Sequence, residues 1–182
     1  MEFLDQMKVR RTVRKYKKDP VREEDLQKVL EAARWAPSWA NFQCWEYVVV
    51  KDAQLKGQIA NAFPKGNPII PALMDAPVVL VACGQLKKAG YFRDKVATDK
   101  GDWFMFDVAL SMENLILAAY SVGLGTAIVG AFDAKKVAAA LGIPENVGVV
   151  AITPLGYPAE IPPAPERKEI KEFVHWDKFG NR

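Results

Sequence analysis

Hydrophobic residues recur at helical spacing in several stretches of the chain. Leu26, Val29, Leu30 and Ala33 repeat at intervals of three and four, which predicts a helix from about residue 22 to 34 that ends before Pro37. The same reasoning predicts helices over residues 53–62 and 104–122, a helix that follows the capping residue Asp133 and ends at Leu141, and a short helix over residues 2–7.

Continuous apolar runs lie between these helices. Residues 46–50, 76–83 and 147–155 are typical of strands buried on both faces of a sheet. A brief strand or loop is expected over residues 127–129, after glycines end the long helix. Helices and strands that alternate around one sheet define an α+β protein, and no linker or repeat divides residues 1–182, so we expect a single domain.

The helix over residues 104–122 is apolar nearly all round, which requires a place at the centre of the domain or against another subunit. This pattern favours a dimer. Asp107, Glu113 and Asn114 interrupt the apolar run, so it does not fit a membrane span. Hydrogen bonds to helix ends or an intersubunit contact would satisfy these polar groups without catalysis.

Composition narrows the function classes. Half of the residues are apolar, enough to form a hydrophobic core without disulfides or bound metal. The 25 basic and 22 acidic side chains leave a net charge too small to indicate a nucleic-acid-binding protein. Cys44 and Cys83 are widely spaced, which favours a reducing compartment and core packing over structural metal or a reactive thiol. The first thirty residues lack the apolar core of a signal peptide, so we expect a cytoplasmic protein. The lone His175 excludes mechanisms that need two histidines.

The densest chemical signal is the basic segment over residues 8–18, which carries seven lysines and arginines. In an extended segment Arg10, Thr12 and Arg14 would project to one side, where guanidinium and hydroxyl groups suit a phosphate or carboxylate. The alternative is an ordinary solvated run of charge. The segment therefore predicts an anion site if its arginines converge.

Other motifs are weaker. Gly123-Leu124-Gly125-Thr126 lacks the third glycine of a dinucleotide fingerprint and the lysine of a P-loop, so a helix stop explains it. Glu23, Glu24 and Asp25 occupy the first turn of a helix, where acidic groups complement the dipole. Residues 84–100 are polar and expected to be mobile. Prolines at 158, 162, 163 and 165 predict an extended tail of a kind that wraps a partner.

Four groups of residues together resemble the FMN-dependent nitroreductase family over almost the whole chain. They are Arg10-Arg11-Thr12-Val13-Arg14, the turn over residues 32–45, Gly123-Leu124-Gly125-Thr126 with Gly130-Ala131-Phe132-Asp133, and Leu155-Gly156-Tyr157-Pro158. The resemblance implies an intertwined homodimer of three-layer α/β/α sandwiches, each with a central mixed, mainly antiparallel sheet. It also implies two FMN sites at the subunit interface, each built from both chains.

Matched position by position, the family assigns the basic segment to the flavin. Arg10 and Thr12 would hold the phosphate and ribityl chain, and Arg14 would lie near the pyrimidine edge, with Arg11 in support. A guanidinium at that edge would stabilise the negative charge of reduced flavin. No acid–base pair and no metal is then required of the protein.

The family also assigns contacts outside the basic segment. Pro37, Ser38 and Asn41 would come from the partner subunit and cover the flavin, and Arg167 with Lys168 on the tail would complete the phosphate clamp. Cys44 stands where the family usually has proline. The family's further polar flavin contacts, before the second strand, have no clear counterpart here, although Lys65 and Asn67 lie nearby.

The backbone of Ile128, Val129 and Gly130 would lie beside flavin N5, with the Gly130 N–H as the donor. No side chain is expected to be catalytic, because hydride would pass to N5 itself. NADH or NADPH would act as a transient reductant and leave before the acceptor binds in the same place, a ping-pong mechanism.

The activity implied is reduction of a nitroaromatic, quinone or similar planar small-molecule acceptor. Five aromatic residues are candidates for the pocket wall, although core packing would equally explain them: Trp39, Phe42, Trp103, Phe104 and Phe106. Two alternatives stay open. One is a specialised flavoenzyme of the same fold, dehalogenase-like or flavin-consuming, and the other is a flavin-binding or delivery protein without turnover.

Overall fold

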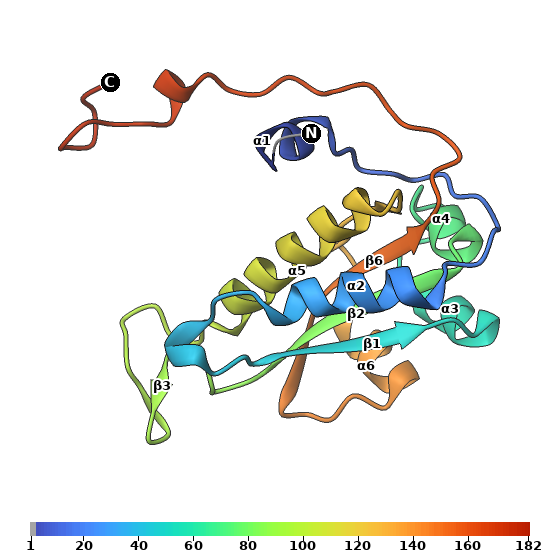
Figure 1. Ribbon diagram of the computed structural model, residues 1–182. Helices are drawn as coiled ribbons and strands as arrows, with labels where there is room; N and C mark the ends of the chain where they lie inside the picture. Colours follow the sequence, from blue (N-terminus) through green and yellow to red (C-terminus); the bar gives the residue numbers. More distant parts are fainter. Residues whose placement is uncertain (1–2) are drawn as a thin grey trace.

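The computed structural model describes residues 3–182 (Figure 1). The regular elements are α1 (Phe3–Val9), α2 (Glu23–Arg34), β1 (Trp45–Val50), α3 (Ala53–Ala60), α4 (Ile70–Asp75), β2 (Val78–Gln85), β3 (Tyr91–Phe92), β4 (Lys95–Val96), α5 (Phe104–Ser121), β5 (Gly125–Thr126), α6 (Ala134–Leu141) and β6 (Val147–Gly156). Short 3-10 turns lie at Trp39–Asn41 and Ile170–Glu172. The predicted helices and the three long strands are confirmed to within a few residues; Met1 and Glu2 lie outside the described residues.

One antiparallel sheet organises the chain, with its strands in the order β1-β2-β6-β5. A parallel bridge between Thr12 and Thr126 adds the basic segment beside β5, at the sheet edge. The sheet is therefore mainly antiparallel and becomes mixed through this bridge. The position matters because it ties residues 12 and 13 to the segment that leads into residues 127–130.

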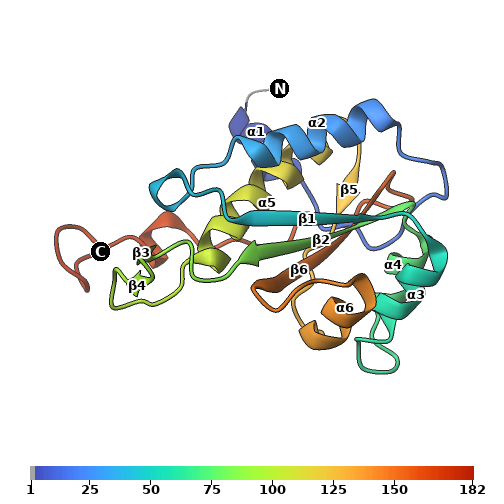
Figure 2. The same ribbon diagram turned by 90° about the horizontal axis from the view of Figure 1, so that it is seen from below.

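Alternate residues of β2 face opposite layers. Val79 and Val81 point to the side covered by α3, α4 and α6, whereas Val78 and Leu80 point to α2 and α5. Figure 2 shows the three layers, with α2 and α5 on one side of the sheet and α3, α4 and α6 on the other. Burial on both faces explains the continuous apolar runs, and the three-layer α+β fold is confirmed.

Three polar side chains of α5 anchor the last turn of α2 and the segment that follows it. Asp107 accepts hydrogen bonds from the Trp39 N–H, the Ser111 hydroxyl donates to the Ala33 carbonyl, and the Asn114 amide donates to the Ala32 carbonyl. Glu113 is exposed. The interpretation of Asp107 and Asn114 as structural hydrogen-bonding groups is confirmed.

Two elements differ from the sequence prediction. Helix α4 was not expected; Pro71 sits at its start, where the missing N–H of proline costs nothing. Residues 84–100, expected to be polar and mobile, contain the hairpin β3–β4, whose turn residues Arg93 and Asp94 have φ of 47° and 61°.

The C-terminal tail begins on the body of the protein and then leaves it. Ala159 N–H donates to the Lys15 carbonyl and Lys17 N–H to the Tyr157 carbonyl, each at 2.9 Å. Beyond this point the chain runs extended past α1 (Figure 1), as the prolines predict. Among residues 3–182 no helix has both the length and the hydrophobicity that a bilayer crossing requires.

Candidate functional site

The basic segment leaves α1 and becomes extended within three residues. The Arg10 N–H still donates to the Gln6 carbonyl at 3.0 Å as part of the helical turn, whereas the Val13 N–H donates to the Thr126 carbonyl at 2.9 Å. Thr12 and Arg14 consequently share one hollow with Lys15, Glu160 and Pro162. Arg10 lies in a different hollow, because it is not yet part of the extended run.

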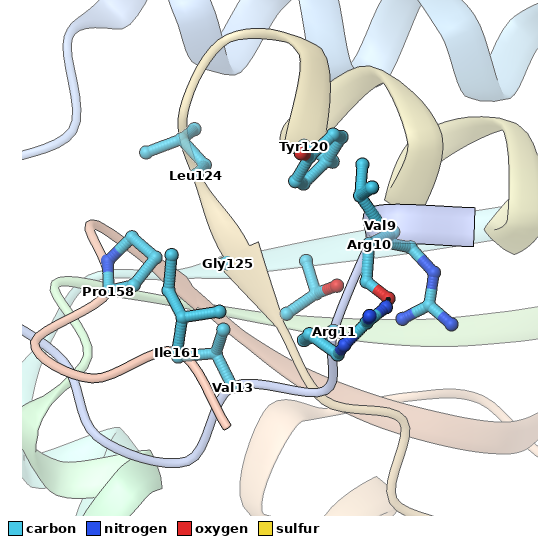
Figure 3. Close-up of a pocket in the computed structure, with 10 residues that line it drawn as sticks. Val9, Arg10, Arg11, Val13, Tyr120, Leu124, Gly125, Pro158 and Ile161 are labelled. Carbon is cyan, nitrogen blue, oxygen red and sulfur yellow. Dashed lines mark hydrogen bonds between the residues drawn. The ribbon is translucent and has the colours of Figure 1, made fainter. Parts of the chain in front are cut away.

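Figure 3 shows the hollow at Arg10, a space of about 120 Å³ with mainly apolar walls. Its lining includes Val13, Tyr120 and Leu124, and the Arg10 side chain extends away from Leu124. Arg11 holds the end of α1, since its guanidinium donates to the carbonyls of Lys8 at 2.6 Å and of Arg10 itself at 2.8 Å. Arg11 thus fixes the backbone that carries the anion-binding candidates.

Arg10 and Arg14 have cationic groups that the chain leaves available. In the part of the chain that the structure describes, neither guanidinium forms an ion pair or a side-chain hydrogen bond. Lys15, by contrast, pairs with Glu160 in the hollow that Thr12 and Arg14 line. Glu160 was not foreseen, because nothing in the sequence links a tail carboxylate to a segment 145 residues away.

A third hollow, of about 320 Å³, lies where the loop after α2 meets the start of α5. Pro37 and Ser38 line it beside an aromatic cluster: the ring centroids of Trp39 and Trp103 are 5.1 Å apart, and those of Trp103 and Phe106 are 5.0 Å apart. Three of the five aromatic candidates therefore gather with two of the proposed flavin contacts.

The other two aromatic candidates lie elsewhere. Phe104 packs against the sheet, where a Cβ added at Gly84 would lie 2.9 Å from its ring and one added at Gly148 would lie 3.0 Å away. Phe42 is 44% exposed at the far end of the loop. Phe104 thus supports the fold, as the core interpretation predicts, and the residues of the hollow are the better pocket candidates.

The loop over residues 38–44 has an unusual backbone. Ala40, Asn41 and Gln43 have φ of 45°, 58° and 49°, a left-handed conformation that costs about 1–2 kcal/mol for each residue with a Cβ. Hydrogen bonds hold it: Ser38 Oγ accepts from the Gln43 N–H at 3.0 Å. Such strain persists only where surrounding contacts determine the conformation, and it is typical of functional loops.

The segment after β5 presents a free backbone donor. Val129 exchanges two hydrogen bonds of 2.9 Å with Ile152, which fixes the segment against β6. The next residue, Gly130, is exposed. Over residues 3–182 its backbone N–H has no hydrogen-bond partner. Ile128 is 59% exposed. The segment can therefore offer an N–H to a ligand.

The tail residues stand apart from these groups. Arg167 and Lys168 are exposed, and the Arg167 guanidinium donates to the neighbouring Glu166 carbonyl at 3.2 Å. Within residues 3–182 neither of them forms a hydrogen bond or ion pair with the basic segment, and neither lines its two hollows. A single chain thus does not assemble all of the predicted site residues.

The two cysteines are core residues. Cys44 is fully buried, and burial together with the Asp107 carboxylate raises its pKa to about 12. Burial also raises the pKa of Cys83 to about 12. Neither thiol is a nucleophile at neutral pH, so the core-packing interpretation is confirmed. In the described part of the chain no cluster of His, Cys, Asp and Glu side chains suits a metal ion.

Comparison with known proteins identifies the class. The family model described as "Nitroreductase family" matches residues 7–157, and the chain therefore belongs to the nitroreductase family, a family of flavoprotein oxidoreductases. An NADH dehydrogenase of Thermus thermophilus is 32% identical over 92% of this chain and 92% of its own length.

Solved structures agree with this assignment. A nitroreductase family protein from Clostridium novyi NT superposes with a TM-score of 0.78 at 32% identity, over 100% of this chain and 96% of that one. An oxidized iodotyrosine deiodinase bound to FMN and 3-iodo-L-tyrosine superposes with a TM-score of 0.82 at 28% identity, over 98% of this chain and 100% of that one.

Proposed function

We propose that this chain is an NAD(P)H-dependent FMN oxidoreductase that reduces a nitroaromatic, a quinone or a similar planar acceptor. The observation that carries the proposal is the hollow in which Pro37 and Ser38 meet the rings of Trp39, Trp103 and Phe106. Aromatic walls suit planar ligands, which stack against them, and the polar loop beside them suits a heterocycle with several hydrogen-bonding atoms.

The residues of the basic segment fit FMN. Arg10 and Arg14 carry cationic groups without internal partners in the described chain, and Thr12 adds a hydroxyl in the hollow shared with Arg14. We assign Arg10 and Thr12 to the phosphate and ribityl chain and Arg14 to the pyrimidine edge, with Arg11 in support. The unpaired Gly130 N–H fits an acceptor atom of the ring system.

The complete site would require a homodimer. Pro37, Ser38 and Asn41 would cover the flavin held mainly by the second copy, and Arg167 with Lys168 would reach the phosphate on a wrapped tail. Support comes from the apolar side chains that the tail exposes in one chain: Ile161, Ile170, Phe173, Trp176 and Phe179 are between 59% and 92% exposed. Such side chains become buried when a tail wraps a partner.

Bound FMN would supply the redox chemistry, taking electrons from NADH or NADPH and delivering them to the acceptor. The chain itself would orient the cofactor: Arg14 would favour negative charge at the pyrimidine edge, and the Gly130 N–H would donate to an acceptor atom of the ring system. The aromatic hollow would admit the nicotinamide and the acceptor in turn. This shared place is the physical basis for a ping-pong order of binding.

The test is steady-state kinetics on the purified protein with NADH and NADPH and a panel of nitroaromatic and quinone acceptors. Parallel double-reciprocal plots would support the ping-pong order. Absence of flavin reduction by either nucleotide would overturn the proposal and favour a flavin-binding or delivery protein.

A dehalogenase-like activity is the second candidate, favoured by the similarity to the deiodinase structure, which covers the whole length of that chain. It would release halide from a halogenated aromatic substrate when the flavin is reduced. Halide release measured beside nitro-group reduction would separate the two activities.

A further inference from the structure

Asp107 holds both ends of the loop over residues 38–44. Its carboxylate is 1% exposed in the first turn of α5, and its two oxygens lie 3.0 and 3.1 Å from the Trp39 nitrogen, which donates to them. The Cys44 Sγ lies 3.6 Å from one of these oxygens, so the thiol donates from the other end of the loop. One buried side chain therefore bridges the two points where the loop leaves and rejoins the body.

The Asp107 charge has no cation beside it. Over residues 3–182 the carboxylate forms no ion pair, and the groups that face it are the Trp39 N–H, the Cys44 thiol and the amino-terminal end of α5. A buried carboxylate without a cation is costly, and an amide or an apolar side chain would fill the same space. The Asp107 carboxylate instead accepts hydrogen bonds from the Trp39 backbone N–H, so its charge is stabilised only while that N–H stays in place.

The loop needs such an anchor because its own backbone is strained. Ala40, Asn41 and Gln43 have positive φ, and the strain falls between the two residues that Asp107 holds. The tilted contact between the Trp39 and Trp103 rings fixes a side chain and not the direction of the Trp39 N–H. The carboxylate fixes the Trp39 N–H, at the point where the turn begins.

We propose that Asp107 is a positioning residue, which holds the loop over residues 38–44 in the conformation that lets Ser38 and Asn41 contact FMN. This inference rests on the proposed function, since it takes FMN as the ligand of the loop. Asp107 lies at the wall of the aromatic hollow but is only 1% exposed, so in this account it does not touch FMN and acts through the backbone of Trp39.

The test compares Asp107→Asn with Ser111→Ala. The amide keeps the size of the carboxylate but places an NH₂ group where an oxygen now faces the Trp39 N–H. Ser111 is buried one turn further along α5, where its hydroxyl donates to the Ala33 carbonyl at 3.1 Å and lies 2.9 Å from the Tyr47 hydroxyl, so its loss removes two hydrogen bonds that do not reach the loop. Thermal melting of both variants checks that they fold.

Two measurements separate positioning from general stability. Amide hydrogen exchange of residues 38–44 in the full chain without added FMN should become about tenfold faster or more in Asp107→Asn, the size expected for one charge-assisted hydrogen bond. The FMN dissociation constant, from fluorescence titration, should rise by a similar factor of about ten. Ser111→Ala should lower the melting temperature and leave both quantities unchanged.

The outcomes are distinguishable. Unchanged amide exchange of residues 38–44 in Asp107→Asn would overturn the proposal that Asp107 anchors the loop, whether or not the FMN dissociation constant changes. Faster exchange with unchanged FMN affinity would overturn the link between the loop and the cofactor. Equal effects of the two variants on both measurements would show a merely structural role. Failure of the unaltered protein to bind FMN would overturn the proposed function, and the exchange measurement would still report on the anchor.

Discussion

Val13 packs directly on the backbone of Gly125, so closely that a Cβ at position 125 would lie 2.6 Å from Val13 Cγ2. The Val13 N–H donates to the carbonyl of the next residue, Thr126, at 2.9 Å. The absence of a side chain at 125 thus allows the basic segment to lie against β5. This contact places Thr12 and Arg14 where the proposed site needs them.

We expect Gly125→Ala to destabilise the protein by about 1–3 kcal/mol, because the methyl group forces Val13 away from the sheet edge. The change in the free energy of unfolding is measured by urea denaturation. FMN affinity should fall as well, since Thr12 and Arg14 move with Val13.

Gly57→Ala is the matched control. Gly57 lies within α3, and no heavy atom lies within 4 Å of a Cβ built there, so the same methyl group should stabilise the protein by about 0.5–1 kcal/mol through helix propensity. Equal and small effects at the two positions would contradict the account of the close approach.

Arg10→Ala and Arg14→Ala should differ in kind. Loss of Arg10 should weaken FMN binding by about 1.5–3 kcal/mol, the range for a hydrogen bond to a charged group. Loss of Arg14 should lower the flavin reduction potential, because a cation no longer stabilises the reduced ring. Fluorescence titration measures the first and potentiometric titration the second; negligible changes in both would contradict the assignment.

Phe106→Ala and Phe104→Ala should separate pocket from core. Phe106 is 54% exposed in the aromatic hollow, so its loss should raise the KM for planar acceptors with little change in stability. Phe104 covers Gly84 and Gly148, so its loss should lower stability by roughly 3 kcal/mol, near the lower end for phenylalanine removal, because the ring is only half-buried. The reverse pattern would place the acceptor elsewhere.

Stability should fall at alkaline pH because of the buried thiols. The pKa of Cys44 is raised to about 12, so its contribution is fully present below the pKa of the unfolded chain, about 8.5, and is lost as the pH rises toward 12. Between those values each such thiol gives a slope of about −1.4 kcal/mol per pH unit. Cys44→Ser, which keeps a donor for Asp107, should make the pH dependence shallower in urea denaturation between pH 8.5 and 10.5; an unchanged slope would contradict it.

Much of the fold could be predicted from local pattern. The helical spacing of Leu26, Val29 and Ala33 and the double-sided burial of β2 are properties of neighbouring residues, so the sequence alone indicates them. Helix α4 was not predicted because it has only six residues and includes a proline, which is rare inside helices. The hairpin β3–β4 was not predicted because each of its strands has two residues, too few to show an alternation of apolar and polar side chains.

The site was less predictable, because it depends on contacts between distant segments. Alternation placed Thr12 and Arg14 together, but it also placed Arg10 with them, and the sequence could not show that α1 continues through Val9. The contact between Asp107 and Trp39 spans 68 residues of sequence. The sequence indicated that a buried Asp107 needs a hydrogen-bonding partner, but it could not identify Trp39 as that partner. Contacts from a second chain are assigned through family resemblance alone and stay predictions.

The central claim is that this chain holds FMN, and the most direct measurement is the flavin content of the purified protein. Denaturation should release a yellow chromophore that chromatography identifies as FMN, in an amount equimolar with the chain, and added NADH or NADPH should bleach it under anaerobic conditions before release. A colourless protein that takes up no FMN when the cofactor is supplied in excess would contradict the claim.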